Sequence, residues 1–256
     1  MASLEGYNVA ITGGGSGIGL ATTVELCSRG ATVWVAELTP HVPAKLESLV
    51  QAKKVFFHGG VDVASRDACV RFLDEVVAKA GGRRLDCLVN NAGIGPAEGP
   101  IATDETFDKI VDVNLRGTWN YGTQALRIME KQEPKGPWGT RGTIVNVASM
   151  SGLFGHNSLA VYTATKHASV GLVKAWSKDF APLGIRINAV APSVTETEGV
   201  KIWFAQRKKD FNEDIKPPPA GRFAQPSEIA KVIAFLLGED SSYINGQTIP
   251  INGGAV

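Results

Sequence analysis

The sequence predicts an α/β fold in which helices cover both faces of one parallel β-sheet. Near-continuous apolar runs alternate with segments of helical apolar periodicity along the whole chain. Strands that are apolar on both sides are typical of a parallel sheet buried under helices, not of a sheet with one solvated face. With right-handed crossovers, this alternation gives a doubly wound sheet, for which we expect seven strands.

The individual elements follow from these runs in chain order. The expected strands are Val9–Thr12, Thr32–Ala36, Val55–Val61, Cys87–Asn90, Thr143–Val147, Arg186–Val190 and Gln247–Pro250. The expected helices lie near residues 18–30, 41–52, 66–80, 104–131, 161–182 and 226–238. Three irregular stretches remain, at residues 93–100, 133–142 and 193–220. We interpret 133–142 as a surface loop. We interpret 193–220, with a short helix around 198–213, as a substrate loop or lid.

Length and composition indicate a single domain spanning residues 1–256. The formal net charge is +1 without a basic stripe, which argues against nucleic acid as a partner. No apolar run approaches the roughly 18 residues that cross a bilayer, and the first residues lack the pattern of a secretory signal. We therefore expect a cytoplasmic protein with no membrane partner.

Neither the cysteines nor the histidines have metal-ligand spacing, so we expect no metal site. The three cysteines are scattered, their number is odd, and no Cys-x-x-Cys occurs. Buried, reduced thiols are the expected state. The residues concerned are Cys27, Cys69, Cys87, His41, His58, His156 and His167.

A glycine-rich turn joins the first expected strand to the first expected helix. Glycines allow the chain to turn sharply and let a bulky phosphate approach the backbone. The amino end of the following helix adds free N–H groups and a positive dipole end. In this context, the run Thr12-Gly13-Gly14-Gly15-Ser16-Gly17-Ile18-Gly19 predicts a cradle for the pyrophosphate of a dinucleotide.

An acidic residue, Glu37, follows the second expected strand, about 20 residues after the glycines. A carboxylate at this place accepts hydrogen bonds from the ribose hydroxyls of the adenosine. It also repels a 2′-phosphate, and no arginine or lysine stands beside it or at the variable positions of the glycine turn. These features predict NAD as the cofactor in preference to NADP.

Tyr162 and Lys166 are four residues apart in an expected helix, so that one helical face carries both. A phenol has a pKa of about 10 and is a poor base in water. A cation held nearby stabilises the phenolate and lowers that pKa, which suits proton exchange with an alcohol near neutral pH. The pair indicates an acid–base catalyst, although an isolated pair of this spacing is also typical of an exposed helix face.

Taken together, the motifs resemble those of the short-chain dehydrogenase/reductase family, of the Tyr-x-x-x-Lys type. They occur in the family's order and spacing and cover nearly the whole chain. They are Thr12-Gly13-x-x-x-Gly17-Ile18-Gly19, Asn90-Asn91-Ala92-Gly93, Asn114, Ser149, Tyr162-x-x-x-Lys166, Tyr243–Gln247 and Asn252–Gly254. The resemblance implies a single-domain Rossmann fold and an NAD(P)-dependent oxidoreductase that interconverts a secondary alcohol and a ketone.

The resemblance also implies catalytic roles for four residues. Tyr162 is the expected general base in oxidation and general acid in reduction, and Lys166 lowers its pKa and holds the nicotinamide ribose. Ser149, with the neighbouring Ser151 as a rival, donates a hydrogen bond to the substrate oxygen. Asn114 interrupts its helix and orders a water beside the lysine.

Further residues are implied as cofactor contacts. The glycine turn lines the pyrophosphate, Glu37 faces the adenosine ribose, and residues after the later strands line the remainder. Ser193 stands where the family has a glycine, in a segment that touches the carboxamide. The expected contacts are Gly13, Ser16, Gly17, Ile18, Gly19, Glu37, Asp62, Val63, Asn90, Ala92, Gly93, Tyr162, Lys166, Thr195 and Thr197.

We expect a bulky, apolar cyclic alcohol or its ketone as the substrate, of terpenoid, steroid or polyketide type from secondary metabolism. The apolar Leu153–Phe154 segment suits such a ring system. Trp203, Phe204 and Phe211 in the lid would suit it too, with packing onto the protein body as the equal alternative. His156 is either a substrate hydrogen-bond partner or an ordinary loop histidine.

Two other interpretations stay open at this point. One is an NADP-dependent ketone or 3-oxoacyl reductase. The other is a dinucleotide-sensing regulatory or scaffold protein, although such a protein does not need the complete catalytic set. The resemblance further implies a homo-oligomer, most often a tetramer, assembled through the helices near 104–131 and 161–182.

Overall fold

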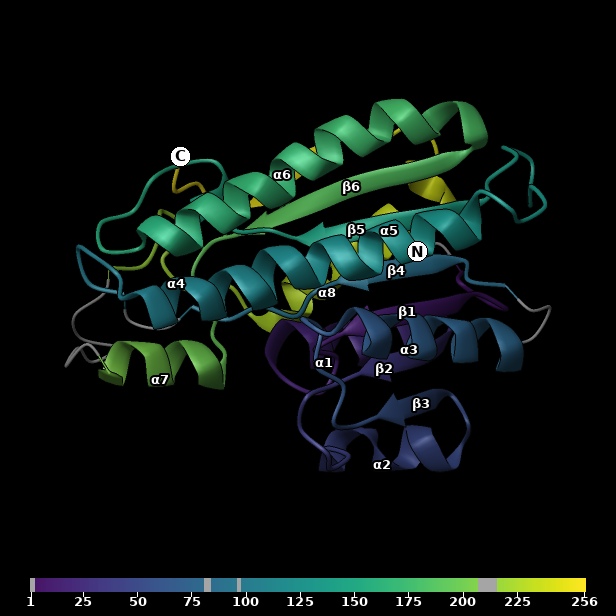
Figure 1. Ribbon diagram of the computed structural model, residues 1–256, viewed down its shortest axis with the longest axis horizontal. Helices are drawn as coiled ribbons and strands as arrows, with labels where there is room; N and C mark the ends of the chain where they lie inside the picture. The colour runs from purple at the N-terminus through teal and green to yellow at the C-terminus, as the bar shows by residue number, and fades with distance from the viewer. Residues whose placement is uncertain (1–2, 81–83, 96–97, 207–215) are drawn as a thin grey trace.

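The computed structural model describes residues 3–80, 84–95, 98–206 and 216–256. Its centre is a seven-stranded sheet of order β3-β2-β1-β4-β5-β6-β7, in which all neighbouring strands run parallel (Figure 1). The strands are β1 (Asn8–Thr12), β2 (Thr32–Ala36), β3 (Val55–His58), β4 (Cys87–Asn90), β5 (Gly142–Val147), β6 (Ile185–Pro192) and β7 (Thr248–Ile251). The predicted fold class is therefore confirmed.

Helices connect the strands and cover both faces of the sheet (Figure 1). They are α1 (Gly17–Ser28), α2 (Ala44–Gln51), α3 (Arg66–Lys79), α4 (Asp104–Ile110), α5 (Gly117–Met129), α6 (Ala160–Phe180), α7 (Glu198–Gln206) and α8 (Pro226–Leu237). Shorter turns are the π-helical η2 (Val111–Arg116) and the 3₁₀ segments η3 (Met150–Gly152), η4 (Ala181–Leu183) and η5 (Glu239–Ser241). Within the described ranges, none of the helices has both the length and the apolar character needed to cross a membrane.

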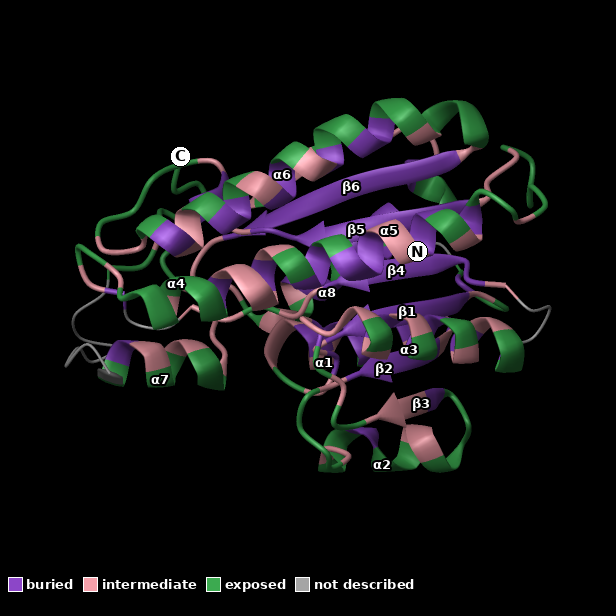
Figure 2. Ribbon diagram, viewed as in Figure 1, coloured by how far each residue is buried: buried purple, intermediate pink, exposed green. Residues whose placement is uncertain are grey.

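Two apolar clusters, one on each face of the sheet, form the core. On one face, Leu26 of α1 and Ile233 of α8 pack with Val9 and Ile11 of β1. On the other face, helices α3, α5 and α6 pack with Ala10 of the same strand. Successive residues of a strand point to opposite faces, so a strand covered on both sides must be apolar throughout. The central strands are accordingly buried along their whole length, while the helices expose their outer sides (Figure 2).

Some predicted boundaries differ from the structure. The third strand was expected to reach Val61, but it ends at His58, because Gly60 (φ 74°) turns the chain away from the sheet. The expected helix at 104–131 is divided by the π-helical turn η2. The expected helix around 198–213 is present as α7 to Gln206, and its remaining residues lie outside the described part of the chain.

The segment 133–142, predicted as a surface loop, forms a hairpin that is exposed over residues 133–138 and leads into β5 at Gly142. Lys135 and Thr140 exchange two backbone hydrogen bonds of 2.9 Å each. The Arg84 guanidinium donates to the carbonyl oxygens of Glu133, Thr140 and Arg141 at 2.6, 2.9 and 3.0 Å. The hairpin therefore rests on Arg84 just before β4, at the amino ends of the strands.

The order of the strands places the ligand site at the opposite end. Connections from β1 run to β2 on one side, while β4 lies on the other side of β1. In open α/β sheets, ligands bind outside the carboxyl ends of the strands where the strand order reverses. The predicted site residues follow the carboxyl ends of β1 to β6, beside α7 and the C-terminus at the left of Figure 1.

Candidate active site

The glycine turn between β1 and α1 is fixed by Asn91, the residue after β4. Gly13 (φ 63°) and Gly17 (φ 50°) have left-handed backbone, which favours glycine. The Asn91 amide donates to the carbonyl oxygens of Thr12 and Gly13 at 3.0 and 2.9 Å. A Cβ on Gly19 would collide with the carbonyl oxygen of Gly13. The turn can therefore close this tightly only with glycine at position 19.

The start of α1 fits a pyrophosphate. Ser16 stands at the N-cap, and its side chain forms no cap hydrogen bond. The first N–H groups of an α-helix have no intrahelical acceptor, and the helix dipole adds positive potential at the same place. In this structure those groups belong to the turn of Gly17, Ile18 and Gly19, as predicted. The arrangement is the one that binds phosphate groups in dinucleotide sites.

Glu37 follows β2, and its carboxylate lies against the glycine turn. Oε2 accepts a hydrogen bond from the Gly15 N–H, and Oε1 accepts one from the Leu38 N–H, each at 2.9 Å. A Cβ on Gly15 would lie 2.8 Å from Oε2, so the carboxylate keeps this place only beside glycine. Two backbone N–H groups thus hold the carboxylate, and its remaining lone pairs can accept from a ligand.

The predicted residues after β3 are fixed by α5. Asp62 is exposed, and its Oδ1 accepts from the Ala64 N–H at 2.9 Å. Val63 is buried and packs against Gly117, where a Cβ would lie 2.8 Å from Val63 Cγ2. Asn120 donates to the carbonyl oxygens of Val63 and Ala64, both at 3.1 Å. This loop thus presents an exposed carboxylate on a rigid support.

Tyr162 and Lys166 lie one turn apart on α6, as predicted. Lys166 Nζ is 5.6 Å from the centroid of the Tyr162 ring and donates to the carbonyl oxygen of Val147 at 2.9 Å. The side chain of Lys166 is buried, and burial lowers its pKa to about 8. A Cβ on Gly93 would lie 3.3 Å from Lys166 Nζ, so glycine at that position leaves room around the ammonium group.

Burial sets the direction of the Tyr162 pKa in the structure without a cofactor. Burial raises the pKa of Tyr162, and a side-chain hydrogen bond with Ser149 lowers it only in part. The physical reason is that desolvation disfavours the phenolate, while Lys166 Nζ lies over the ring and is bound to the Val147 carbonyl. Helical spacing thus predicts that the two side chains are neighbours, whereas the pKa of Tyr162 also depends on burial, which the spacing does not contain.

Asn114 lies in the π-helical turn η2, which interrupts the helix formed by α4 and α5 as predicted. Its Oδ1 accepts from the Ile94 N–H at 2.8 Å, and its Nδ2 donates to the Ile94 carbonyl at 2.9 Å and to Thr165 Oγ1 at 3.3 Å. Its own carbonyl oxygen accepts from Thr118 Oγ1 at 2.7 Å. The side chain therefore joins α6 to the loop after β4. Single π-helical turns inside helices are frequent at functional sites.

Of the two candidate serines, Ser149 faces Tyr162. Ser149 follows β5 with extended backbone, and its Oγ accepts from the Ser151 N–H at 3.1 Å. Its hydroxyl also makes the side-chain hydrogen bond with Tyr162. Ser151 is buried in the short helix η3. Asn114 of η2, Ser149 before η3, and Tyr162 and Lys166 of α6 thus come together.

The segment after β6 covers the glycine turn. Thr197 Cγ2 would lie 3.3 Å from a Cβ on Gly17, so the start of α7 packs directly over the turn. Thr195 is buried, and its Oγ1 donates to the Ser193 carbonyl at 3.0 Å. Among the non-glycine residues that the structure describes, only Lys53 and Ser158 have positive φ, so Ser193 replaces the family's glycine without backbone strain.

The residues predicted to face the substrate differ in their exposure. Phe154 and His156 are exposed, while Leu153 packs against the core. Phe204 is buried, with Trp203 edge-on at 4.6 Å between ring centroids, which agrees with packing onto the protein body. Phe211 lies outside the described residues.

The structure adds two residues that the sequence reasoning did not assign. Asn91 belongs to the Asn-Asn-Ala-Gly motif, so its position beside Asn90 was a usable signal. Glu98 is buried, and its carboxylate accepts from the N–H groups of Val161 and Tyr162, both at 2.8 Å. Glu98 stands in a Gly/Pro-rich loop 64 residues before Tyr162, and only the fold brings the two together.

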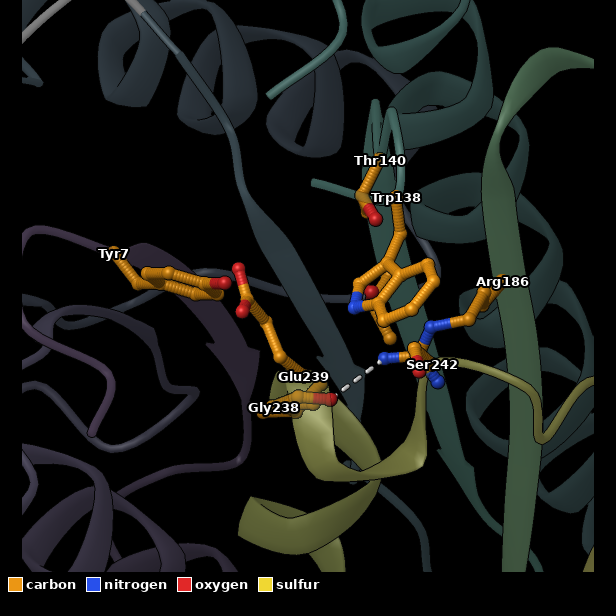
Figure 3. Close-up of a pocket in the computed structure, with 9 residues that line it drawn as sticks. Tyr7, Trp138, Thr140, Arg186, Gly238, Glu239 and Ser242 are labelled. Atoms are coloured by element: carbon orange, nitrogen blue, oxygen red, sulfur yellow. Dashed lines mark hydrogen bonds between the residues drawn. The ribbon is translucent and has the colours of Figure 1, made fainter. Parts of the chain in front are cut away.

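A separate hollow lies at the amino ends of the strands, away from this site (Figure 3). Its volume of about 20 Å³ is room for roughly one water molecule, which excludes a cofactor or a substrate. Tyr7, Trp138 and Arg186 are among its walls. In the described part of the chain, no three His, Cys, Asp or Glu side chains gather as metal ligands do.

The buried Lys166 makes the stability of the protein depend on pH. Its pKa of 10.5 when solvated falls to about 8 in the fold, so between these values the unfolded chain binds more protons. Stability therefore rises with pH in this window, by about 3 kcal/mol at roughly 1.4 kcal/mol per tenfold change in proton affinity. We expect wild type to gain this amount relative to Lys166→Met between pH 7 and 10.5, measured by urea unfolding. A difference between the two proteins that does not change with pH would contradict the prediction.

Several known proteins are similar to this chain over nearly its whole length. A protein-family model described as enoyl-(acyl carrier protein) reductase matches residues 13–256. A 3-oxoacyl-[acyl-carrier-protein] reductase of Thermotoga maritima is 38% identical, over 99% of both chains. A meso-2,3-butanediol dehydrogenase of Serratia marcescens is 37% identical, over 96% of this chain and 93% of its own. A 2,5-dichloro-2,5-cyclohexadiene-1,4-diol dehydrogenase of Sphingobium indicum is 33% identical, over 99% of this chain and 98% of its own.

Solved structures match over nearly the whole chain as well. The crystal structure of levodione reductase superposes with a TM-score of 0.85 at 32% identity, over 97% of both chains. ElxO with NADP bound gives 0.83 at 30% identity, over 100% of this chain and 99% of its own. A 3-ketoacyl-(acyl-carrier-protein) reductase from Brucella melitensis complexed with NADH gives 0.84 at 28% identity, over 99% of both chains.

Proposed function

The chain belongs to the short-chain dehydrogenase/reductase family and is an NAD(P)-dependent oxidoreductase of alcohols and ketones, and we propose that it prefers NAD and a bulky apolar cyclic substrate. The observation that carries the cofactor preference is the Glu37 carboxylate, held against the glycine turn by the Gly15 N–H. Relatives named as reductases and dehydrogenases leave no support for a purely sensing or scaffolding role.

The residues present fit a nicotinamide dinucleotide. The glycine turn and the first turn of α1 would hold the pyrophosphate, and Glu37 would accept from the adenosine ribose hydroxyls. Asp62 and Val63 would flank the adenine. The remaining contacts would come from Asn90, Ala92, Gly93, Lys166, Thr195 and Thr197. When bound, the cofactor supplies or accepts the hydride at its nicotinamide ring.

Proton transfer falls to Tyr162 and its neighbours. In oxidation, the Tyr162 phenolate takes the hydroxyl proton of the alcohol, and in reduction the phenol returns it to the carbonyl oxygen. The Ser149 hydroxyl, which hydrogen-bonds with Tyr162 in the absence of substrate, would turn its one proton to the substrate oxygen and stabilise the developing charge there. Lys166 would hold the nicotinamide ribose, and its positive charge near the Tyr162 ring would favour the phenolate. We propose that Asn114 orders a water beside this ammonium.

The NAD preference rests on charge. A 2′-phosphate placed where the ribose hydroxyls bind would lie beside the Glu37 carboxylate, and like charges in contact cost several kcal/mol. The neighbouring Leu38 and Thr39 offer no cation to offset that repulsion. The cofactor found with one similar reductase is NADH and with another protein NADP, so the family itself permits either.

The substrate proposal rests on a glycine beside Tyr162, on an exposed apolar side chain and on a relative. A Cβ on Gly95 would lie 3.4 Å from Tyr162 Cε2, so a larger residue at position 95 would pack against the ring. Phe154 offers an exposed apolar surface on the loop after Ser149. One relative is named as a dehydrogenase of a cyclic diol, which supports a cyclic alcohol. We also propose that residues 193–220 form the substrate lid of the single domain.

A second candidate is an NADP-dependent 3-oxoacyl reductase, which the identity of 38% to the Thermotoga maritima enzyme favours.

We further propose a homo-oligomer, because Phe107 of α4 and Trp119 of α5 are about half exposed on helices expected at an interface.

The direct test is turnover across a panel of hydroxylated compounds and ketones, followed at the nicotinamide absorbance with NAD(H) and NADP(H) in parallel. Oxidation of bulky cyclic alcohols with NAD supports the proposal. Reduction of 3-oxoacyl thioesters with NADPH alone supports the second candidate. Bound NADH without turnover of any panel member would contradict the proposed substrate class.

Gly95→Val tests the substrate proposal within the same panel. The added side chain fills the space beside the Tyr162 ring, so we expect kcat/KM for bulky cyclic alcohols to fall about tenfold or more, as for a changed hydrophobic pocket. Small alcohols should keep most of their turnover, and NADH affinity should not change. An equal loss for small and large alcohols would show that position 95 does not limit substrate size.

A further inference from the structure

Helix α6, which carries Tyr162 and Lys166, begins without a cap of its own. Its N-cap residue is Leu159, whose side chain has no hydrogen-bond acceptor. The second and third helical residues are Val161 and Tyr162, and N–H groups at these positions have no intrahelical partner. A buried N–H group left without a partner is costly, so the start of this helix needs an acceptor from elsewhere.

Glu98 supplies that acceptor from the loop after β4. Oε2 accepts from the Val161 N–H and Oε1 from the Tyr162 N–H, both at 2.8 Å. Its relative exposure is 7%, and among the described residues no lysine, arginine or histidine forms an ion pair with it. The carboxylate is thus bonded to the first turn of α6, where the helix dipole favours a negative charge.

The start of the same loop, at Ile94, is hydrogen-bonded to Asn114 of the site. Asn114 bonds both the N–H and the carbonyl oxygen of Ile94, and Gly95 lies beside the Tyr162 ring. Glu98 therefore holds the backbone of Tyr162, and Gly95 lies beside its ring. Both residues belong to the loop after β4, which Asn114 anchors at Ile94. Of Ile94, Gly95 and Glu98, Glu98 is the residue that hydrogen-bonds to the backbone of Tyr162.

We propose that Glu98 is a positioning residue, which fixes the backbone of Tyr162 and so the direction of its phenol towards the substrate oxygen. The proposal rests on the proposed function, in which Tyr162 exchanges the proton. Catalysis is sensitive to such placement, because a shift of about 1 Å can lower the rate on the order of 100-fold. The cofactor turn is bound to Asn91 and not to Glu98, so cofactor affinity should not depend on Glu98.

Glu98→Gln is the variant of choice, because glutamine has the shape of glutamate but replaces one of its two acceptor oxygens with an NH₂ donor. That NH₂ group would face the N–H of Val161 or Tyr162, so one of the two hydrogen bonds is lost. Asp67→Asn is the matched control, since Asp67 is an exposed acid in the first turn of α3, away from the site. We expect kcat for alcohol oxidation to fall about 10- to 100-fold in Glu98→Gln. The NADH dissociation constant should stay within about twofold, and the isotope effect with alcohol deuterated at the carbinol carbon should increase, because hydride transfer becomes rate-limiting. The control should match wild type.

Further measurements distinguish a failure of the Glu98 proposal from a failure of the proposed function. Unchanged kcat per folded site in Glu98→Gln, with only a lower melting temperature, would overturn the proposal and leave the proposed function intact. If wild type oxidises no alcohol, the proposed function fails, and hydrogen exchange still tests Glu98. Amides of residues 160–166 should exchange faster in Glu98→Gln than in Asp67→Asn, and equal exchange overturns the proposal. If Glu98→Gln does not fold, Glu98→Asp keeps the charge but is too short for both N–H groups, and full wild-type kcat in that variant overturns it.

Discussion

Tyr162→Phe is expected to lower the rate of alcohol oxidation on the order of 1,000-fold while leaving NADH binding unchanged. The substitution removes one oxygen atom and keeps the ring, so α6 and the contact with Gly95 are preserved. What is lost is the group that exchanges the proton and the hydrogen bond with Ser149. Steady-state kinetics and NADH fluorescence titration measure the two effects separately.

Tyr121→Phe provides the matched control, because the same atom is removed elsewhere. The Tyr121 hydroxyl is fully buried on α5, and no residue in the described ranges hydrogen-bonds to it. Removing a buried hydroxyl without a partner should cost neither activity nor stability. Turnover in Tyr162→Phe within about tenfold of wild type would exclude Tyr162 as the acid–base group, since such catalysis contributes at least about 100-fold.

Replacement of Glu37 should reverse the cofactor preference. The double variant Glu37→Ser with Leu38→Arg removes the carboxylate beside the Gly15 N–H and adds a cation that can pair with a 2′-phosphate. We expect the ratio of kcat/KM for NAD to that for NADP to fall about 100-fold or more. This estimate follows from like-charge repulsion of several kcal/mol, at about 1.4 kcal/mol per tenfold change.

Glu47→Gln on α2 is the control for this change, because Glu47 is an exposed acid remote from the turn. Its cofactor ratio should equal that of wild type. A wild-type protein that binds NADPH more tightly than NADH would contradict the interpretation of Glu37 before any variant is made. It would also favour the oxoacyl reductase candidate.

The parts of the fold that depend on local sequence could be predicted. The central strands are apolar on both faces because the sheet is covered twice, and that requirement is visible in runs such as Val9–Thr12. The glycines of the turn are dictated by local backbone geometry at Gly13 and Gly17. The interruption at Asn114 was implied by the family motif and is present as η2.

The parts that depend on distant contacts could not be predicted. Glu98 carries no local pattern, and its partners at Val161 and Tyr162 become neighbours only when β4 and α6 are in place. The pKa of Tyr162 is raised by burial and lowered by the Ser149 hydrogen bond, and helical spacing contains neither. Burial of Phe204 in α7 likewise follows from tertiary packing and not from its sequence neighbours.

The attachment of the chain after β4 has a consequence for protein engineering. Asn91, Ile94 and Glu98 succeed one another within a few positions, yet they bind the glycine turn, η2 and α6 respectively. A graft that exchanges this segment with that of a homologue breaks three separate junctions at once. A productive chimera must therefore carry the glycine turn, Asn114 and the first residues of α6 along with the grafted segment, so these stretches form one exchangeable module.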